Sequence, residues 1–81
     1  MSRRKRLVKY GLTEKQYRLR MAFQEGLCMI CRKEPAGYID HNHRTGAVRA
    51  LLCRGCNSGL GHFKDDPIRL RRAADYLELY P

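Results

Sequence analysis

Two Cys-x-x-Cys pairs constrain this chain more than any other feature of its sequence. The first runs from Cys28 to Cys31 and the second from Cys53 to Cys56, with 21 residues between them. Each pair can form a tight knuckle whose two thiolates point at one ion, and two knuckles complete a tetrahedron without an open position. An 81-residue chain buries too little apolar surface to be more than marginally stable. Stabilisation by a metal ion or by disulfides is therefore expected. The spacing predicts one structural zinc ion, held by Cys28, Cys31, Cys53 and Cys56.

Two other readings of the four cysteines compete with zinc. They could form two disulfides, with three possible connectivities. Residues 1–9 are basic but no apolar stretch follows them, so no signal peptide is evident, and we expect a cytoplasmic protein whose thiols stay reduced. That expectation favours a metal over disulfides. An iron–sulfur cluster also takes four thiolates, so it remains an alternative to zinc.

The charge of the chain indicates a polyanionic partner. Seventeen Lys and Arg against eight Asp and Glu give a formal net charge of +9. Neither a long apolar span nor a helix with one basic and one bulky apolar face is evident, which argues against a membrane. We therefore expect DNA, contacted mainly through its phosphates, although the charge could serve solubility alone. Residues 1–9 are predicted to be a flexible basic arm with phosphate-binding residues Arg3, Arg4, Lys5 and Arg6.

Residues 10–81 are predicted to form one domain. Thr13 as N-cap and Gln16 three positions later form a capping box, with Leu12 and Tyr17 placed as a hydrophobic staple, so a helix should begin there and end near Gly26. Residues 38–41 and 47–52 read as the two strands of a hairpin, joined by a turn over residues 42–46. The second strand leads directly into the second knuckle.

Two further helices are predicted after the second knuckle. A short one, weakened by two glycines, covers residues 57–63. The last begins at Asp65-Asp66-Pro67, with an acid at the cap and proline at the first helical position. Its apolar residues recur at the i, i+3, i+4, i+7 spacing that is typical of a face turned toward the core. They are Leu70, Ala73, Ala74 and Leu77.

Asp40, His41 and Asn57 are the candidate catalytic residues. Phosphodiester hydrolysis needs a water nucleophile, a base and a cation that stabilises charge on the phosphate and leaving oxygen. Asp40 and Asn57 offer the hard oxygen ligands that Mg²⁺ prefers, and His41 can act as a base at neutral pH. Neighbours on a regular strand point to opposite faces, so Asp40 and His41 can both contribute only if the strand bends or ends there.

The combined pattern resembles one family of nucleases. In order, the chain carries CxxC, DHxHxxGxVR, LLCxxCN and LGxFxDDPxxLxxAAxYL, over roughly residues 10–79. This order is similar to that of the phage recombination endonuclease VII family, within the HNH or His-Me finger nucleases. The resemblance implies a small α+β fold, in which a ββα-metal core carries the four-cysteine zinc site and flanking helices.

The resemblance also implies roles for individual residues. Asp40 and Asn57 would hold one catalytic Mg²⁺ or Mn²⁺, His41 would be the general base, and His43 would lie in the active site near the scissile phosphate. Hydrolysis would leave 5′-phosphate and 3′-hydroxyl ends. We add Arg44 and Arg49 to the phosphate-binding residues. The dimeric junction resolvase of this family uses further helices, so we expect nicking by a monomer or weak homodimer, which could join a larger phage assembly.

The alternative function is a zinc-containing DNA-binding module without catalysis. An acid that repels phosphate would be a poor choice for binding alone, so Asp40 together with His41 and Asn57 favours the enzyme. A zinc-stabilised protein-interaction domain would explain the cysteines but not the charge. Individually, His43 could bond the turn, Asn57 could cap a helix, and His62 could face solvent or DNA.

Overall fold

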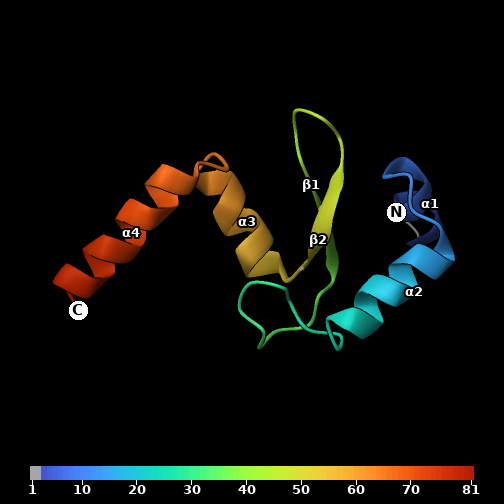
Figure 1. Cartoon of the computed structure of the whole chain (residues 1–81), viewed down its shortest axis with the longest axis horizontal. Coiled ribbons are helices and arrows are strands. Elements are labelled where there is room, and N and C mark those ends of the chain that lie inside the picture. The colour runs from blue at the N-terminus through green and yellow to red at the C-terminus, as the bar shows by residue number, and fades with distance from the viewer. Residues whose placement is uncertain (1–2) are drawn as a thin grey trace.

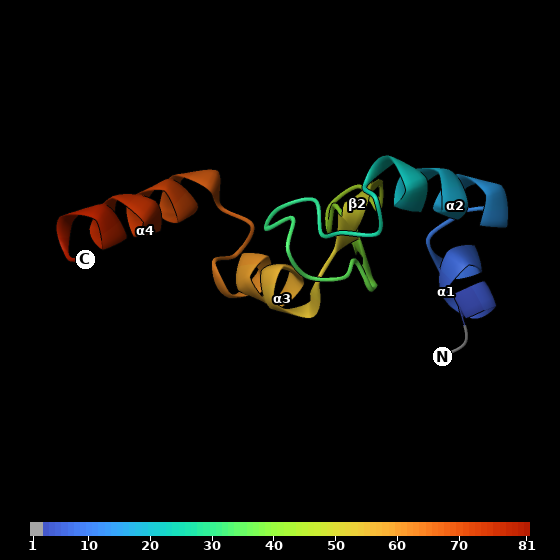
Figure 2. The same ribbon diagram turned by 90° about the horizontal axis from the view of Figure 1, so that it is seen from below.

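A two-stranded antiparallel hairpin lies at the middle of the molecule, between two pairs of helices (Figure 1). The computed structural model describes residues 3–81. The molecule is elongated, 43 × 27 × 20 Å, with the first two helices toward one end and the last helix at the other (Figures 1 and 2). The elements are α1 (Arg3–Lys9), α2 (Glu14–Phe23), β1 (Tyr38–His41), β2 (Val48–Leu52), α3 (Arg54–His62) and α4 (Pro67–Leu79).

The N-terminal segment differs from its prediction as an arm. It forms α1 from residue 3 onward, and Leu7 is only 3% exposed, packed in a cluster with Leu12, Ala36, Ile39 and Leu51. The prediction weighed the charges of residues 3–9 and overlooked that one apolar side chain among them finds a place in the core. The assignment of residues 1–2 to the arm lies outside the described part of the chain. The domain boundary after residue 9 stays a prediction.

Helix α2 begins as its sequence predicts and ends at Phe23, slightly before the predicted end near Gly26. Thr13 Oγ1 accepts a hydrogen bond from the Gln16 amide at 3.1 Å, and Gln16 Oε1 accepts one from the Thr13 amide at 2.8 Å. Gly26, with φ of +75°, adopts the left-handed conformation that glycine tolerates best, just after the helix. Helix α2 lies against β2, where Arg20 Nη1 in the last turn of α2 donates to the Arg49 carbonyl at 3.1 Å.

The hairpin has the predicted first strand, and its second strand begins at Val48, one residue later than expected. Ile39 pairs with Leu51 and His41 with Val48, so the register shifts by a residue between Ile39 and His41. The turn is built by Asn42, whose Oδ1 accepts hydrogen bonds from the backbone amides of residues 44 and 45 at 2.8 and 3.0 Å. Asn42 is thus a turn residue, as its sequence position indicated.

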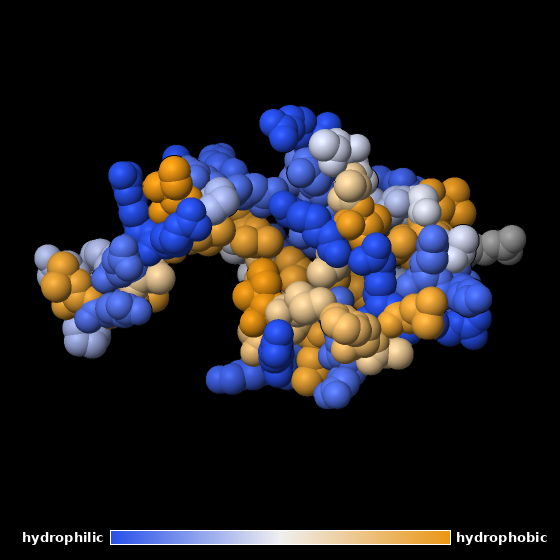
Figure 3. Space-filling view, in the orientation of Figure 1, coloured by the Kyte–Doolittle hydropathy of each residue, from blue (hydrophilic) through white to orange (hydrophobic). Residues whose placement is uncertain are grey.

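Helices α3 and α4 begin at side-chain caps. Cys53 Sγ accepts from the Cys56 amide at 3.4 Å, and Asp66 Oδ1 accepts from the Ile68 amide at 3.0 Å, with Pro67 at the first helical position. The expectation that one face of α4 packs into the core is wrong, because α4 buries none of its residues and Leu77 is 66% exposed. Periodicity identifies an apolar face but not its partner. Figures 1 and 3 show α4 extending away from the hairpin with apolar side chains on its surface.

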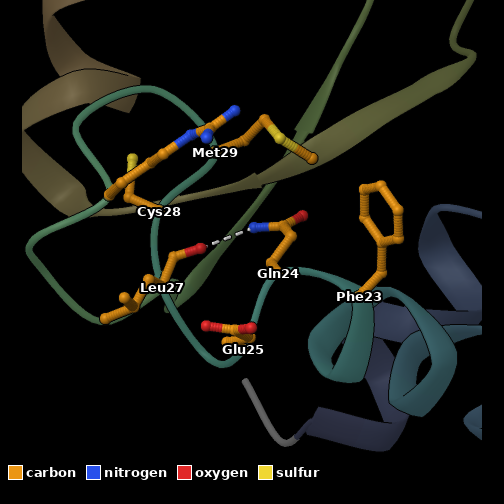
Figure 4. A pocket seen from close by; sticks show the side chains of 7 residues that line it. Phe23, Gln24, Glu25, Leu27, Cys28 and Met29 are labelled. Atoms are coloured by element: carbon orange, nitrogen blue, oxygen red, sulfur yellow. Dashed lines mark hydrogen bonds between the residues drawn. The ribbon is translucent and has the colours of Figure 1, made fainter.

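A pocket lies between the end of α2 and the first cysteine knuckle (Figure 4). The exposed ring of Phe23 stands at its edge, and Gln24 crosses it to reach the carbonyl oxygen of Leu27. Asp40, His41 and Asn57 do not line this pocket. Within residues 3–81 no helix has the length and apolar character that a membrane span requires.

Candidate active site and metal centre

The four cysteines meet at one point, as the spacing predicted. Their Sγ atoms all lie within 4.8 Å of one another, and Cys31 Sγ is 3.9 Å from Cys53 Sγ. Cys28 lies in the first knuckle, where its amide donates to the Glu34 carbonyl at 2.8 Å and its carbonyl accepts from the Arg32 amide at 2.9 Å. All four are free thiols. Four convergent sulfur ligands are the donor set of a structural zinc site.

The electrostatics of this cluster favour a cation. Burial raises the pKa of the Cys28 thiol, but backbone hydrogen bonds at Cys53, Cys31 and Ile30 outweigh burial and lower this pKa to about 6. Burial, with hydrogen bonds to Cys53 and Cys28, raises the pKa of Cys56 to about 12. Without a cation only part of the cluster ionises at neutral pH. A divalent ion removes this conflict, because a coordinated thiol is deprotonated outright.

Asp40 lies on β1, buried to 6% exposure, and its carboxylate is fully engaged by Arg49 of β2. Arg49 Nε donates to Asp40 Oδ2 at 2.6 Å and Arg49 Nη2 donates to Oδ1 at 2.9 Å. This hydrogen-bonded carboxylate is the main cause that raises the pKa of Arg49. Arg49 was predicted to bind DNA phosphates, whereas in this structure its guanidinium is paired within the protein.

The two histidines of the hairpin lie side by side. The ring centroids of His41 and His43 are 4.5 Å apart, and those of Tyr10 and His41 are 5.0 Å apart. The register shift between Ile39 and His41 supplies the irregularity that the sequence argument required of this strand. His41 is half-buried, and His43 is exposed.

Asp65 is a member of this group that sequence reasoning missed. Its Oδ2 accepts a hydrogen bond from Arg49 Nη2 at 3.2 Å and lies 4.0 Å from His43 Nε2. The prediction treated Asp65-Asp66-Pro67 as a helix start, and Asp66 alone performs that role. The signal that could have identified Asp65 is therefore the surplus of acids, since one cap needs only one of them.

Asn57 lies on the first turns of α3, the helix that packs against β1. Its amide donates to the Cys53 carbonyl at 3.0 Å, which ties it to the second knuckle, and its side chain is half-buried. Among the described residues no hydrogen bond joins Asn57 to Asp40, and the four cysteines are the one group of three or more Cys, His, Asp or Glu placed to share an ion. Asp40 and Asn57 as a pair of ligands therefore stay a prediction.

The remaining predicted DNA contacts lie on the surface or outside the described side chains. Arg44 is exposed at the tip of the hairpin and Lys5 is exposed on α1. The structure does not describe the side chains of Arg3, Arg4 and Arg6. His62 is exposed in the last turn of α3.

A hairpin followed by a packed helix, with Asp40 and His41 on its first strand and His43 in its turn, defines the class of ββα-metal nucleases. Among solved structures the chain is similar to the ββα-Me type II restriction endonuclease Hpy99I, with a TM-score of 0.59 and 43% identity, over 67% of this chain and 32% of that one. Residues 3–79 match the profile of recombination endonuclease VII, and the chain belongs to that family.

Two phage proteins are also similar to this chain. The Gene 59 protein of Mycobacterium phage D29 is 42% identical over 80 residues, which cover 93% of this chain and 48% of that protein. The Gene 59 protein of Mycobacterium phage L5 is 41% identical over 76 residues, covering 88% and 46% respectively. The chain thus spans about half the length of these relatives.

Proposed function

We propose that this chain is an HNH-type DNA endonuclease domain that hydrolyses phosphodiester bonds with the help of one divalent ion. The observation that carries the proposal is the juxtaposition on an irregular strand of a buried acid, Asp40, and a half-buried histidine, His41, with His43 beside them. The membership of the endonuclease VII family and the likeness to Hpy99I support it.

The residues present fit a catalytic Mg²⁺ or Mn²⁺. Asp40 and Asn57 would hold it, from β1 and from the helix that packs on β1. The carboxylate of Asp40 is buried and needs a cationic partner, which is Arg49 in this structure and which a bound metal would replace at least in part. When bound, the ion would stabilise the charge that grows on the phosphate and on the leaving 3′ oxygen.

The protein's own groups account for the proton and for positioning. His41 would take the proton of the attacking water, and its ring contacts the rings of both Tyr10 and His43, which would help to orient it. The exposed His43 would face the scissile phosphate. In-line attack on that phosphate leaves 5′-phosphate and 3′-hydroxyl ends. Arg44, Lys5 and the net charge of +9 would hold the DNA backbone, with an affinity that falls steeply as salt is raised.

The setting of this activity is also part of the proposal. The family and its phage relatives favour action on DNA in the cytoplasm of a phage-infected cell, where thiols stay reduced and zinc occupies the cysteine cluster. We propose that the protein nicks DNA as a monomer or weak homodimer, either alone or as part of a larger phage assembly.

One observation favours the second candidate, a DNA-binding module without catalysis. Asp40 is paired on both oxygens with Arg49, as an acid with a purely structural role would be. The two functions differ in what happens to DNA once it is bound. Binding alone needs neither a divalent ion nor His41.

The test is a cleavage assay on supercoiled plasmid and on branched DNA, with and without Mg²⁺. Wild type, His41→Ala and the matched control His62→Ala are run together, and DNA affinity is measured for all three. We expect Mg²⁺-dependent nicking by wild type and by His62→Ala, and none by His41→Ala, at equal affinity. If the wild type and both variants bind DNA but none of them cuts it, the binding module is supported instead.

A further inference from the structure

Asp40, Arg49 and Asp65 form a chain of alternating charge across three parts of the fold. Arg49 on β2 donates two hydrogen bonds to Asp40 on β1, and its Nη2 donates a third to Asp65 in the turn between α3 and α4. The two acids belong to segments that are distant in sequence, and Arg49 bonds to both of them. Arg49 therefore has two acceptors within reach, one buried and one more exposed.

The inner pair creates a conflict for any divalent ion that binds Asp40. Both oxygens of Asp40 accept from Arg49 at 2.9 Å or less, so an ion on this carboxylate would lie next to a positive guanidinium. Two positive charges at such a separation, partly shielded from water, repel each other strongly. Binding is easier if Arg49 withdraws from at least one oxygen of Asp40 and takes another acceptor.

Asp65 is placed to be that acceptor. It already shares Nη2 of Arg49 at 3.2 Å, and its side chain is more exposed than that of Asp40. The Arg49 side chain is 37% exposed, which leaves it room to move outward. The outer hydrogen bond could therefore persist while the two inner ones are exchanged for a metal.

We propose that Arg49 is hydrogen-bonded to Asp40 when no divalent ion is bound. When an ion binds Asp40, Arg49 leaves that carboxylate and keeps its hydrogen bond to Asp65. Arg49 and Asp65 are then positioning residues that set the affinity of Asp40 for the ion. This inference rests on the proposed function, because it takes Asp40 as an ion ligand. It makes Asp65 act on the ion through Arg49 and not as a direct ligand.

The test is Mn²⁺ binding to the zinc-loaded chain, followed by the electron paramagnetic resonance of free Mn²⁺ in the absence of DNA. Asp40→Asn identifies the binding event at this site. Removing the competing charge with Arg49→Gln should tighten Mn²⁺ binding about 5-fold or more, and removing the outer acceptor with Asp65→Asn should weaken it by a similar factor. In the double variant, Asp65→Asn should have no further effect beyond Arg49→Gln.

Three results would overturn the inference. Equal or weaker Mn²⁺ binding by Arg49→Gln would make Arg49 a structural partner only. A loss of affinity from Asp65→Asn that persists in the Arg49→Gln background would make Asp65 a direct ligand. Absence of a Mn²⁺ site that Asp40→Asn removes would exclude the exchange altogether.

A second measurement uses wild type alone, in case Arg49→Gln fails to fold. The side-chain Nε–H resonance of Arg49 should shift on titration with Mg²⁺, and the same titration should leave it unchanged in Asp40→Asn. An Arg49 resonance insensitive to Mg²⁺ in wild type would overturn the inference. If wild type still nicks plasmid with Mg²⁺ in that case, the proposed function stands while the exchange does not.

Discussion

Gln24 and Leu51 are joined by two hydrogen bonds that imitate the pairing of neighbouring strands. Gln24 Nε2 donates to the Leu51 carbonyl at 2.8 Å, and Gln24 Oε1 accepts from the Leu51 amide at 3.0 Å. The same Nε2 donates to the Leu27 carbonyl at 2.8 Å. A single side-chain amide thus bonds both the carbonyl and the amide of Leu51 on β2, and it fixes the end of α2 against the hairpin.

Replacing this amide should destabilise the domain. Gln24→Ala would leave the Leu51 amide, at a fully buried residue, without an acceptor, and should lower the free energy of unfolding by about 1–3 kcal/mol. Gln16→Ala is the matched control, because Gln16 bonds only an exposed amide at the start of α2 and should cost about 1 kcal/mol or less. Urea unfolding followed by circular dichroism measures both. Equal losses would mean that Gln24 has no special role.

The cysteine cluster should be required for folding. Cys53 is a member of the cluster, and Cys53→Ser removes one sulfur ligand while a serine can still cap α3, so loss of the ligand should release zinc and unfold the chain. Zinc content by mass spectrometry should be one ion per wild-type chain, and a strong chelator should unfold wild type until zinc is restored. A zinc-free variant with a native circular dichroism spectrum would refute the assignment.

Removing Arg49 should cost stability as well as change ion binding. Arg49→Gln leaves the buried carboxylate of Asp40 without its cation, and we expect a loss of about 2–3 kcal/mol, below the full cost of a broken buried pair because Arg49 is 37% exposed. Arg44→Gln, at the exposed hairpin tip, should change the stability by less than about 0.5 kcal/mol. Denaturant titrations of the two variants would decide whether the pair carries this energy.

The two leucines at opposite ends of the burial scale should respond very differently to truncation. Leu51 is 0% exposed, so Leu51→Ala should cost about 2–5 kcal/mol. Leu77→Ala in α4 should cost less than about 0.5 kcal/mol in this chain, because nothing in the described structure covers it. Thermal unfolding compares them directly. A large loss from Leu77→Ala would reveal a partner for α4, such as a second copy.

Local patterns account for most of what could be predicted from the sequence. The capping box of Thr13 and Gln16 and the turn at Asn42 each depend on residues a few positions apart, and the convergence of the cysteines follows from the spacing of two Cys-x-x-Cys pairs. The packing of Leu7, the pairing of Arg49 and the role of Asp65 depend on contacts between distant segments. A pattern of charges identifies which residues are basic, but only the fold decides whether they face DNA or an acid of the same chain.

The turn between α3 and α4 has a consequence for how this family can diversify. Lys64 and Asp65 are consecutive non-glycine residues with φ of +58° and +53°, a conformation that costs about 1–2 kcal/mol per residue. This elbow sets the direction in which α4 leaves, since α4 packs on little else. An insertion in this turn would change the direction of α4 and of whatever a longer relative carries after it. Because Asp65 in this turn also accepts a hydrogen bond from Arg49, a change that redirects α4 here would also disturb the position of the guanidinium beside Asp40.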